Sequence, residues 1–287
     1  MSEVPKGVET AAIIYDFDGT LASGNLPEHS LLPALEIEPA EFWSKVKAEA
    51  KLRDADEILT YMHCLLARAR EKGFQLTRQA LERHGSGIPL FPGVEGWFDR
   101  INDYGRNKGL KIEHYIISSG LLEIIEGCSI YKRFKKVFAC AYTYDESGVA
   151  SWPASAINYT NKTQFLFRIN KGIDNTWDNS AINRWQRRSE RHVPFSRMVF
   201  LGDGDTDIPS MKMVRYQGGQ AIAVFDPKAW AKEAAKGKLE QLIAEDRVDY
   251  VASGDYSQGS VLDVTVRGIL GRMALKPDPL LPRTEGR

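Results

Sequence analysis

The feature that most constrains the fold is a short apolar run that ends in two acids. Residues 11–17 read AAIIYDF, and Asp18-Gly19 follows directly. An almost continuous apolar segment of this length is typical of a central strand in a parallel sheet, because helices cover both faces of such sheets. Residues two apart on an extended chain point the same way, so Asp16 and Asp18 can address one pocket.

Further apolar runs alternate with helical patterns along the rest of the chain. This alternation predicts an α/β fold with a doubly wound, Rossmann-like parallel sheet. A small hairpin is predicted to turn at Ser147-Gly148. The other expected strands are HYIISSG (114–120), KVFACAY (136–142), RMVFLGDGD (197–205) and QAIAVF (220–225), and the expected helices lie near 121–127, 162–170, 207–214 and 227–243.

The segment 22–90 has a different, helical character. Apolar residues recur at helical spacing after Asp54, Gly73 is a plausible stop, and Thr77 could cap another short helix. We therefore expect a core domain made of residues 1–21 and 91–287, with an inserted helical domain at 22–90. The Pro-rich tail KPDPLLPRTEGR (276–287) is expected to be loosely ordered.

Composition narrows the classes of partner. The 287 residues carry 38 Lys+Arg and 38 Asp+Glu, so the net charge is +0. No basic excess favours nucleic acid or an anionic membrane surface as a partner. The start of the chain does not resemble a signal peptide, no run of eighteen apolar residues occurs, and the three scattered cysteines do not form a zinc or disulfide pattern. We expect a soluble cytoplasmic protein; its oligomeric state is not indicated.

Polar residues gather where the predicted strands end. Ligands of open parallel sheets bind beyond the carboxyl ends of the strands. Asp16 and Asp18 end one strand, Ser118-Ser119-Gly120 another, and 202–207 (GDGDTD) a third, while Lys162 begins a helix. Carboxylates from two strands repel each other unless a cation lies among them, and oxygen ligands of this kind suit Mg²⁺.

These stretches, in this order, resemble the four motifs of the haloacid dehalogenase (HAD) superfamily. DFDGT (16–20) resembles the first motif, IISSG (116–120) the second, Lys162 the third and GDGDTD (202–207) the fourth. The resemblance covers residues 11 to about 260. The helical insert resembles the type 1 cap of the phosphoserine phosphatase group, so the resemblance implies a HAD α/β core with a helical cap.

The resemblance also implies a metal and a reaction. Mg²⁺ would be held by a carboxylate oxygen of Asp16, the backbone carbonyl of Asp18, and Asp203. Asp16 would form an aspartyl-phosphate, and Asp18 would protonate the leaving alcohol and then activate water. Lys162 would supply positive charge to the phosphoryl group. The implied activity is hydrolysis of a phosphomonoester of a small metabolite.

Other residues of the motifs would hold the phosphoryl group or the turn. Ser118 fits the family pattern Ser-x-Gly, with Ser119 as the alternative, and Gly120 follows with backbone N–H groups that can bind phosphoryl oxygens. Asp207 would orient Lys162 or a metal-bound water. Gly19 would serve the tight turn, and Thr20 would tie that turn down through its hydroxyl.

The substrate is less constrained. Thr206 replaces the Asn usual in the phosphoserine phosphatase group, and segment 171–196 is longer than that group needs. Possible cap contacts to the substrate are Glu28, His29 and Arg53; the alternative is that Glu28 lies on a solvated cap surface. We interpret Trp43, Trp97, Trp177 and Trp185 as packing residues and the basic run 184–192 as an exposed helix face.

Two alternative functions stay open. One is a carbon–halogen or phosphonate hydrolase of the same superfamily, although Asp18 argues against it because such a leaving group needs no acid. The other is a non-catalytic, phospho-accepting regulatory module, which would have neither the cap insert nor an acid at the position of Asp18.

Overall fold

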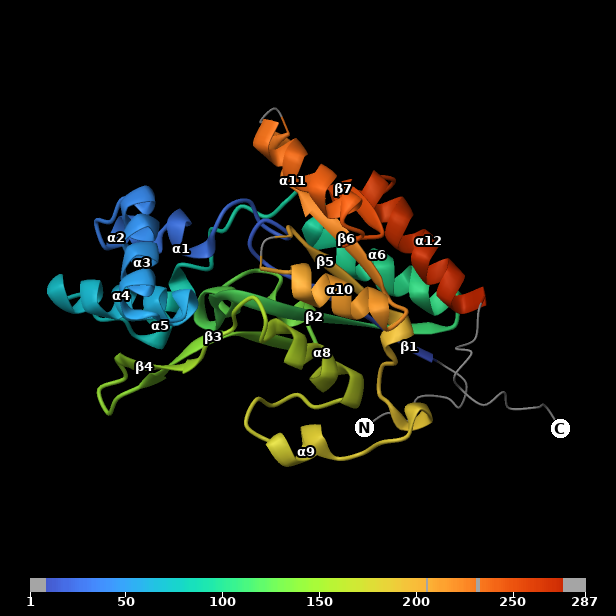
Figure 1. The fold of residues 1–287 in the computed structure, drawn as a ribbon, viewed down its shortest axis with the longest axis horizontal. Helices are drawn as coiled ribbons and strands as arrows, with labels where there is room; N and C mark the ends of the chain where they lie inside the picture. Colours follow the sequence, from blue (N-terminus) through green and yellow to red (C-terminus); the bar gives the residue numbers. More distant parts are fainter. Residues whose placement is uncertain (1–8, 205, 231–232, 276–287) are drawn as a thin grey trace.

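A seven-stranded, mostly parallel sheet forms the centre of the protein. The computed structural model describes residues 9–204, 206–230 and 233–275 (Figure 1). The strand order is β4-β3-β2-β1-β5-β6-β7, and only the β3–β4 pair is antiparallel. The strands are β1 (Glu9–Tyr15), β2 (Leu110–Leu121), β3 (Lys136–Tyr144), β4 (Ala150–Ser155), β5 (Met198–Gly202), β6 (Gln220–Phe225) and β7 (Tyr250–Ser253).

The topology places a switch point at the end of β1. This strand pairs with β2 on one side and β5 on the other, and its residues 11–15 are fully buried. The chain moves outward from β1 in opposite directions along the two halves of the sheet, and right-handed crossovers therefore place their helices on opposite faces. The predicted doubly wound α/β fold is confirmed, and the switch point is where such sheets bind ligands.

The core helices form two groups, one on each face of the sheet. Helices α6 and α12 pack together and contact β2 and β7, whereas α8 and α10 pack together and contact β2, β5 and β6. The bounds are α6 (Val94–Asn107), α7 (Leu122–Glu126), α8 (Lys162–Lys171), α9 (Asn179–Asn183), α10 (Ile208–Tyr216), α11 (Glu233–Ala244) and α12 (Val261–Leu275).

Five helices between β1 and α6 form a lobe beside the sheet, seen at the left of Figure 1. Asp56 caps α4 by accepting from Leu59 N at 2.9 Å, and Thr77 caps α5 by accepting from Ala80 N at 3.1 Å. The helices are α1 (Leu26–His29), α2 (Leu31–Ala34), α3 (Pro39–Arg53), α4 (Glu57–Glu71) and α5 (Arg78–Arg83). We refer to this lobe as the cap.

The β3–β4 hairpin ties the cap to the core. The hydroxyl of Tyr142 donates to the carbonyl of Met62 in α4 at 2.8 Å, and Ala150 N donates to the carbonyl of Leu76 at 2.9 Å. The hairpin turns at Ser147-Gly148, as predicted, through Asp145 N to Val149 O at 2.9 Å. The cap is thus fastened to the sheet at several points.

Some sequence-based predictions are wrong or fall elsewhere. Strand β7 and helix α12 were not predicted. Trp97 is fully buried, but Trp177 and Trp185 are 78% and 77% exposed and are not packing residues. The basic run 184–192 is exposed but contains only a 3-10 turn, Arg188–Glu190. The tail 276–287 lies outside the described residues, and within them no helix combines the length and apolar character needed to cross a bilayer.

Candidate active site

The turn after β1 brings its acids to the carboxyl edge of the sheet. Asp16 N donates to Leu201 O in β5 at 2.9 Å, which fixes the first acid beside the neighbouring strand. The chain then turns through Gly19 at φ +71°, a conformation that L side chains rarely adopt. A Cβ on Gly19 would lie 3.0 Å from the Cβ of Asp203. Glycine at position 19 therefore lets the loop after β1 approach Asp203 closely.

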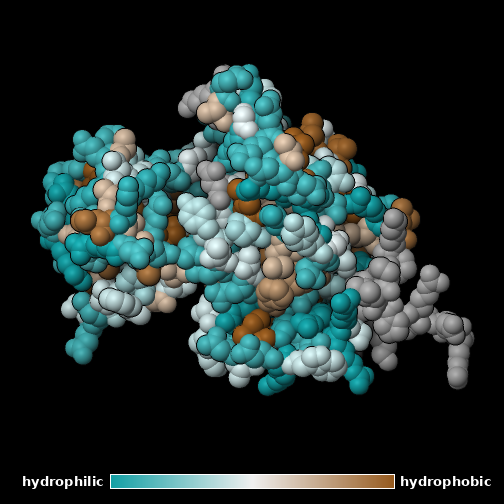
Figure 2. Space-filling model, in the orientation of Figure 1, coloured by the Kyte–Doolittle hydropathy of each residue, from teal (hydrophilic) through white to brown (hydrophobic). Residues whose placement is uncertain are grey.

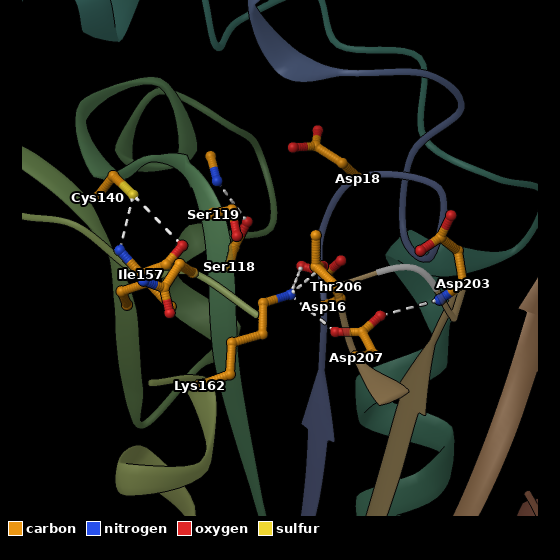
Figure 3. Close-up of polar contacts among 12 residues, drawn as sticks. Asp16, Asp18, Ser118, Ser119, Cys140, Ile157, Lys162, Asp203, Thr206 and Asp207 are labelled. Carbon is orange, nitrogen blue, oxygen red and sulfur yellow. Dashed lines mark hydrogen bonds and ion pairs between the residues drawn. The ribbon is translucent and has the colours of Figure 1, made fainter. Parts of the chain in front are cut away.

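Three carboxylates and one ammonium group converge at this edge. Asp16, Asp203 and Asp207 each offer a carboxylate oxygen within 4.8 Å of the others. Lys162, at the start of α8, has a fully buried side chain whose Nζ lies 3.1 Å from Asp16 Oδ1 and 2.7 Å from Asp207 Oδ1 (Figure 3). Residues from three separate parts of the chain thus meet at one point.

Asp207 is held on both sides. Its Oδ2 accepts from Asp203 N at 3.2 Å, while its Oδ1 accepts from Lys162. A Cβ on Gly202 would lie only 2.2 Å from Asp207 Oδ2, so this glycine makes room for the carboxylate. Lys162 also donates to the hydroxyl of Thr206 at 2.8 Å. Asp207 therefore orients Lys162 directly.

The carboxylate of Asp18 lies apart from this group, above Asp16 in Figure 3. Its Oδ1 accepts from Leu26 N, the first residue of cap helix α1, at 2.7 Å. A Cβ on Gly120 would lie 3.2 Å from both Asp18 Oδ2 and Ser118 Oγ, so these two oxygens flank the same glycine. The carboxylate of Asp18 therefore faces the end of β2 and is held by a hydrogen bond from the cap.

The two serines at the end of β2 differ in their partners. Ser118 is fully buried, and its Oγ accepts from Gly120 N at 2.9 Å, which leaves its own O–H free to donate. Ser119 lines the cavity described below, and its buried hydroxyl oxygen has no hydrogen-bond partner among the described residues. Ser119 therefore lies at the cavity, whereas Ser118 is buried beside Gly120, which lines the cavity.

The electrostatics of the site oppose ionisation of its acids. Burial raises the pKa of Asp16; Lys162 opposes that rise and Asp203 adds to it. Burial and the neighbouring Asp16 raise the pKa of Asp18 well above its usual 3.8. Burial and Asp16 also raise the pKa of Asp207 to about 6. Burial disfavours charge on Lys162, but Asp16 and Asp207 outweigh it, so its pKa is raised.

These observations fit a divalent cation. Asp16 Oδ1 is buried and makes no hydrogen bond of good geometry among the described residues, and its two acidic neighbours lie close enough to share an ion with it. Hard carboxylate oxygens are the ligands that Mg²⁺ prefers. The predicted ligands are Asp16, the backbone carbonyl of Asp18, and Asp203. Asp207 is a third carboxylate within reach of Asp16 and Asp203, and the side chain of Asp18 accepts from Leu26 N of the cap.

A cavity of about 430 Å³ opens above the acids, between core and cap. Its core side includes Asp16, Asp18 and Asp203. Residues that sequence reasoning missed line its cap side and the adjoining loop: Asn25, Pro27, Lys47, Glu57, Ile58, Tyr61 and Tyr159, together with Trp43, which we had interpreted as a packing residue. Apolar and charged cap residues far apart in sequence thus converge only in the folded chain.

The predicted cap contacts do not line this cavity. The carboxylate of Glu28 accepts from Asn25 Nδ2 and Trp43 Nε1, both at 2.6 Å, so it positions two lining residues. His29 lines a separate cavity within the cap, and its Nε2 lies 2.8 Å from Ser23 O. Arg53 is 71% exposed and pairs with Glu49. Tertiary packing thus gives all three side chains partners within the protein, and none of the three lines the cavity.

The expectation for Thr20 is wrong in its detail. Its buried hydroxyl has no hydrogen-bond partner among the described residues. The turn is closed instead by the backbone, with Leu21 N donating to Phe17 O at 2.9 Å. The carbonyl of Thr20 accepts from the hydroxyl of Tyr256 at 2.8 Å, which ties the turn to the segment before α12.

Comparison with known proteins identifies the class of fold. No family model matches the chain. An uncharacterized protein of Borreliella burgdorferi is 27% identical over 278 residues, which cover 88% of this chain and 93% of that protein. A HAD family hydrolase of Salmonella enterica serovar Typhi superimposes with a TM-score of 0.58 at 14% identity, covering 92% of this chain and 73% of the hydrolase. The chain has the fold of the HAD hydrolases.

The likeness extends to the phosphoserine phosphatase form of that fold. A phosphoserine phosphatase carrying a phospho-aspartyl intermediate analogue superimposes with a TM-score of 0.52 at 15% identity, covering 85% of this chain and 93% of that enzyme. A probable phosphoserine phosphatase of Vibrio cholerae gives 0.56 at 12% identity, covering 96% and 69% of the two chains. The predicted resemblance is confirmed at the level of the fold.

Proposed function

We propose that the protein is a Mg²⁺-dependent phosphomonoester hydrolase that acts on a small phosphorylated metabolite through an aspartyl-phosphate on Asp16. The observation that carries the proposal is the meeting of Asp16, Asp203 and Asp207 with the buried Lys162 at the switch point of the sheet. The fold that the chain shares with HAD phosphatases supports the same reading.

In the first step, a carboxylate oxygen of Asp16 attacks phosphorus and the bond from phosphorus to the ester oxygen breaks. Asp18 gives its proton to that oxygen, so the product leaves as a neutral alcohol. The raised pKa of Asp18 supports this role, because the group must hold a proton part of the time near neutral pH.

In the second step, water attacks phosphorus and Asp18 takes up its proton. The bond between phosphorus and the Asp16 oxygen breaks, which restores the carboxylate and releases inorganic phosphate. Lys162 remains charged through both steps because Asp16 and Asp207 raise its pKa, and it stabilises negative phosphoryl oxygens. Mg²⁺, held by Asp16, Asp203 and the backbone carbonyl of Asp18 with Asp207 nearby, would supply further positive charge to those oxygens.

The end of β2 supplies hydrogen-bond donors to the phosphoryl group. Ser118 is our first choice because its O–H is free to donate while its Oγ is fixed by Gly120 N. Ser119 is the alternative, since its buried hydroxyl lies at the cavity without a partner among the described residues. Separate Ser118→Ala and Ser119→Ala variants should divide the roles, with the larger fall in kcat marking the phosphoryl ligand.

The test is hydrolysis of p-nitrophenyl phosphate and of a panel of phosphorylated metabolites, followed by released phosphate. Activity should require Mg²⁺, disappear with a chelator, and fall by on the order of a thousandfold or more in Asp16→Asn, because the nucleophile is removed. Asp103→Asn, at an exposed residue of α6, is the matched control and should be fully active. Full activity in Asp16→Asn would end the proposal.

A further inference from the structure

A second cavity, of about 510 Å³, lies along α8. It is lined by residues of α8 from Gln164 to Lys171, by Gln217 directly after α10, and by the long excursion 172–197 between α8 and β5. Its volume falls within the range of small-molecule sites. The excursion, longer than the phosphoserine phosphatase pattern needs, thus builds a pocket of its own.

The charged residues that line this cavity are all positive. Lys171, Arg188 and Arg191 line it, and none of its described lining residues is acidic. Lys171 Nζ donates to the carbonyls of Ile182 and Arg184, and Arg191 donates to Asn170 Oδ1 at 3.0 Å. These neutral acceptors fix the two cations in place without cancelling their charge.

Arg188 adds a third positive charge. It makes no hydrogen bond or ion pair through its side chain with the described residues, and it is exposed at the mouth of the cavity. Two fixed cations at the wall and one adjustable cation at the mouth form an arrangement that favours an anionic group, because Arg binds phosphate, sulfonate and carboxylate oxygens through paired donors.

The rest of the wall combines apolar residues, two of them aromatic, with uncharged polar side chains. Phe167 of α8 is 36% exposed and packs edge-on against Phe195, with ring centroids 5.2 Å apart. Figure 2 shows a small hydrophobic patch among hydrophilic residues between the positions of α8 and α9. The buried Asn170 fastens this wall, since its Nδ2 donates to Val193 O at 2.7 Å. The flat apolar part of a ligand could therefore pack against Phe167 and Phe195, next to three cations.

The cavity is separate from the catalytic site. Lys162, the first residue of α8, contacts the acids, whereas the second cavity is lined by later residues of the same helix, from Gln164 to Lys171. The two cavities have no lining residue in common.

We propose that this cavity is a second binding site for a small organic anion with a flat apolar body. Arg188, Arg191 and Lys171 hold the anionic group, and the rings of Phe167 and Phe195 contact the body. The ligand is defined by this chemistry, which nucleoside phosphates and aromatic carboxylates or sulfonates share.

The test is isothermal titration of the full chain with naphthalene-1-sulfonate, a non-hydrolysable anion with a flat apolar body. Arg188→Glu should weaken binding at least tenfold, because it reverses one charge at the mouth. Arg187→Glu, the exposed neighbour that does not line the cavity, is the matched control and should change binding less than twofold. Both variants should keep the wild-type Tm and hydrolysis, since neither residue touches the catalytic site.

Two further measurements separate the parts of the proposal. Phe167→Ser should weaken binding of the sulfonate but not of inorganic phosphate, if the ring contacts the apolar body. Asp16→Asn should leave sulfonate binding unchanged, which separates this site from the catalytic one. Equal loss in Arg187→Glu and Arg188→Glu, no loss in Arg188→Glu, or loss in Asp16→Asn would each overturn the proposal.

Discussion

Two groups of buried acids in this protein differ in what surrounds them. Glu113 in β2 accepts from Lys111 at 2.7 Å, Lys135 at 2.9 Å, Tyr115 at 2.7 Å and His192 at 2.6 Å. Burial alone would raise the pKa of Glu113, but these donors outweigh burial and lower it. The acid is stabilised as a carboxylate by groups that the chain itself provides.

The acids at the carboxyl edge of the sheet show the opposite behaviour. Asp16, Asp18 and Asp207 all have raised pKa values, and Lys162 is the one Lys or Arg side chain within 4.0 Å of Asp16 or Asp207 among the described residues. Buried carboxylates that lack enough donors cost free energy. The contrast indicates that the edge is built for positive charge that arrives with ligands, whereas Glu113 is built for stability.

The largest expected effect concerns the proton that Asp18 holds. Asp18→Asn should lower kcat for an alkyl phosphate by about 10²–10⁴-fold, because an alkoxide leaves poorly without a proton. The loss should be smaller for p-nitrophenyl phosphate, whose leaving group needs less help. Steady-state kcat across esters of different leaving-group pKa measures this. An equal loss for all esters would assign Asp18 another role.

Assays of the wild-type protein bear on the alternative functions. If the wild-type protein accumulated a stable phospho-protein without turnover, the regulatory-module hypothesis would be favoured instead. If it released halide without a divalent cation, the dehalogenase hypothesis would replace the phosphatase.

A second test compares stability at the two groups of acids. Glu113→Gln should lower the free energy of unfolding by about 2–4 kcal/mol, less than for a fully buried ion pair because its lysine partners are partly exposed. Asp16→Asn in chelator should change it by less than about 1 kcal/mol, or increase it, because burial disfavours the charge of Asp16 more than Lys162 favours it. Urea unfolding measures both, and similar losses in both variants would break the comparison.

The pH dependence of stability should separate the same pair. The pKa of Glu113 is lowered in the folded state from 4.5, so its contribution is fully present above pH 4.5 and is lost as pH falls below that value. Glu113→Gln should therefore flatten the fall in stability of the wild type below pH 4.5. An unchanged slope would mean that Glu113 is not the group responsible.

The binding of Mg²⁺ should have a third, smaller effect, on the stability of the folded chain. Mg²⁺ at a hundred times its Kd should stabilise the folded chain by about 2.7 kcal/mol, and a chelator should reverse this. Asp203→Asn should remove most of the shift, whereas Glu113→Gln should keep it although it starts from a lower Tm. Thermal unfolding with and without Mg²⁺ measures the difference. A shift that survives in Asp203→Asn would place the ion elsewhere.

Local sequence patterns could predict the sheet edge but not the cap side of the site. The apolar run before Asp16 and the glycines beside Asp18 and Asp203 encode β1 and its close approach to β5 within a few residues. Strand β7 has four residues, and α12 carries several β-branched residues, so neither gives a strong local signal. The cap side of the cavity forms where α3 meets α4, and no single segment encodes that contact.

Glu28 shows why this limit is physical. Its position after the first motif suggested a substrate contact, yet Trp43, fifteen residues later in α3, donates to its carboxylate. Trp43 then packs edge-on against Tyr61 of α4, with ring centroids 5.7 Å apart, and both rings line the cavity. Which cap residue lines the cavity is therefore decided by helix packing.

The smallest expected effect tests whether the cap aligns the catalytic edge. The hydroxyl of Tyr61 in α4 donates to Ser119 O at 2.7 Å. Because the peptide is planar, fixing this carbonyl also fixes the N–H of Gly120, which points at Ser118 Oγ. Tyr142 is the matched control. Its hydroxyl also joins cap and core, because it donates to Met62 O at 2.8 Å, but it does not bond to either serine.

Tyr61→Phe and Tyr142→Phe should each cost about 1 kcal/mol of stability, because each loses one hydrogen bond to a buried carbonyl. Tyr61→Phe alone should also lower kcat, by about tenfold with KM little changed, since a misaligned peptide weakens transition-state contacts more than ground-state binding. Tyr142→Phe should keep kcat within twofold. Equal kcat in the two variants would mean that the cap fastens the core without aligning it, and that Ser118 and Ser119 are positioned by β2 alone.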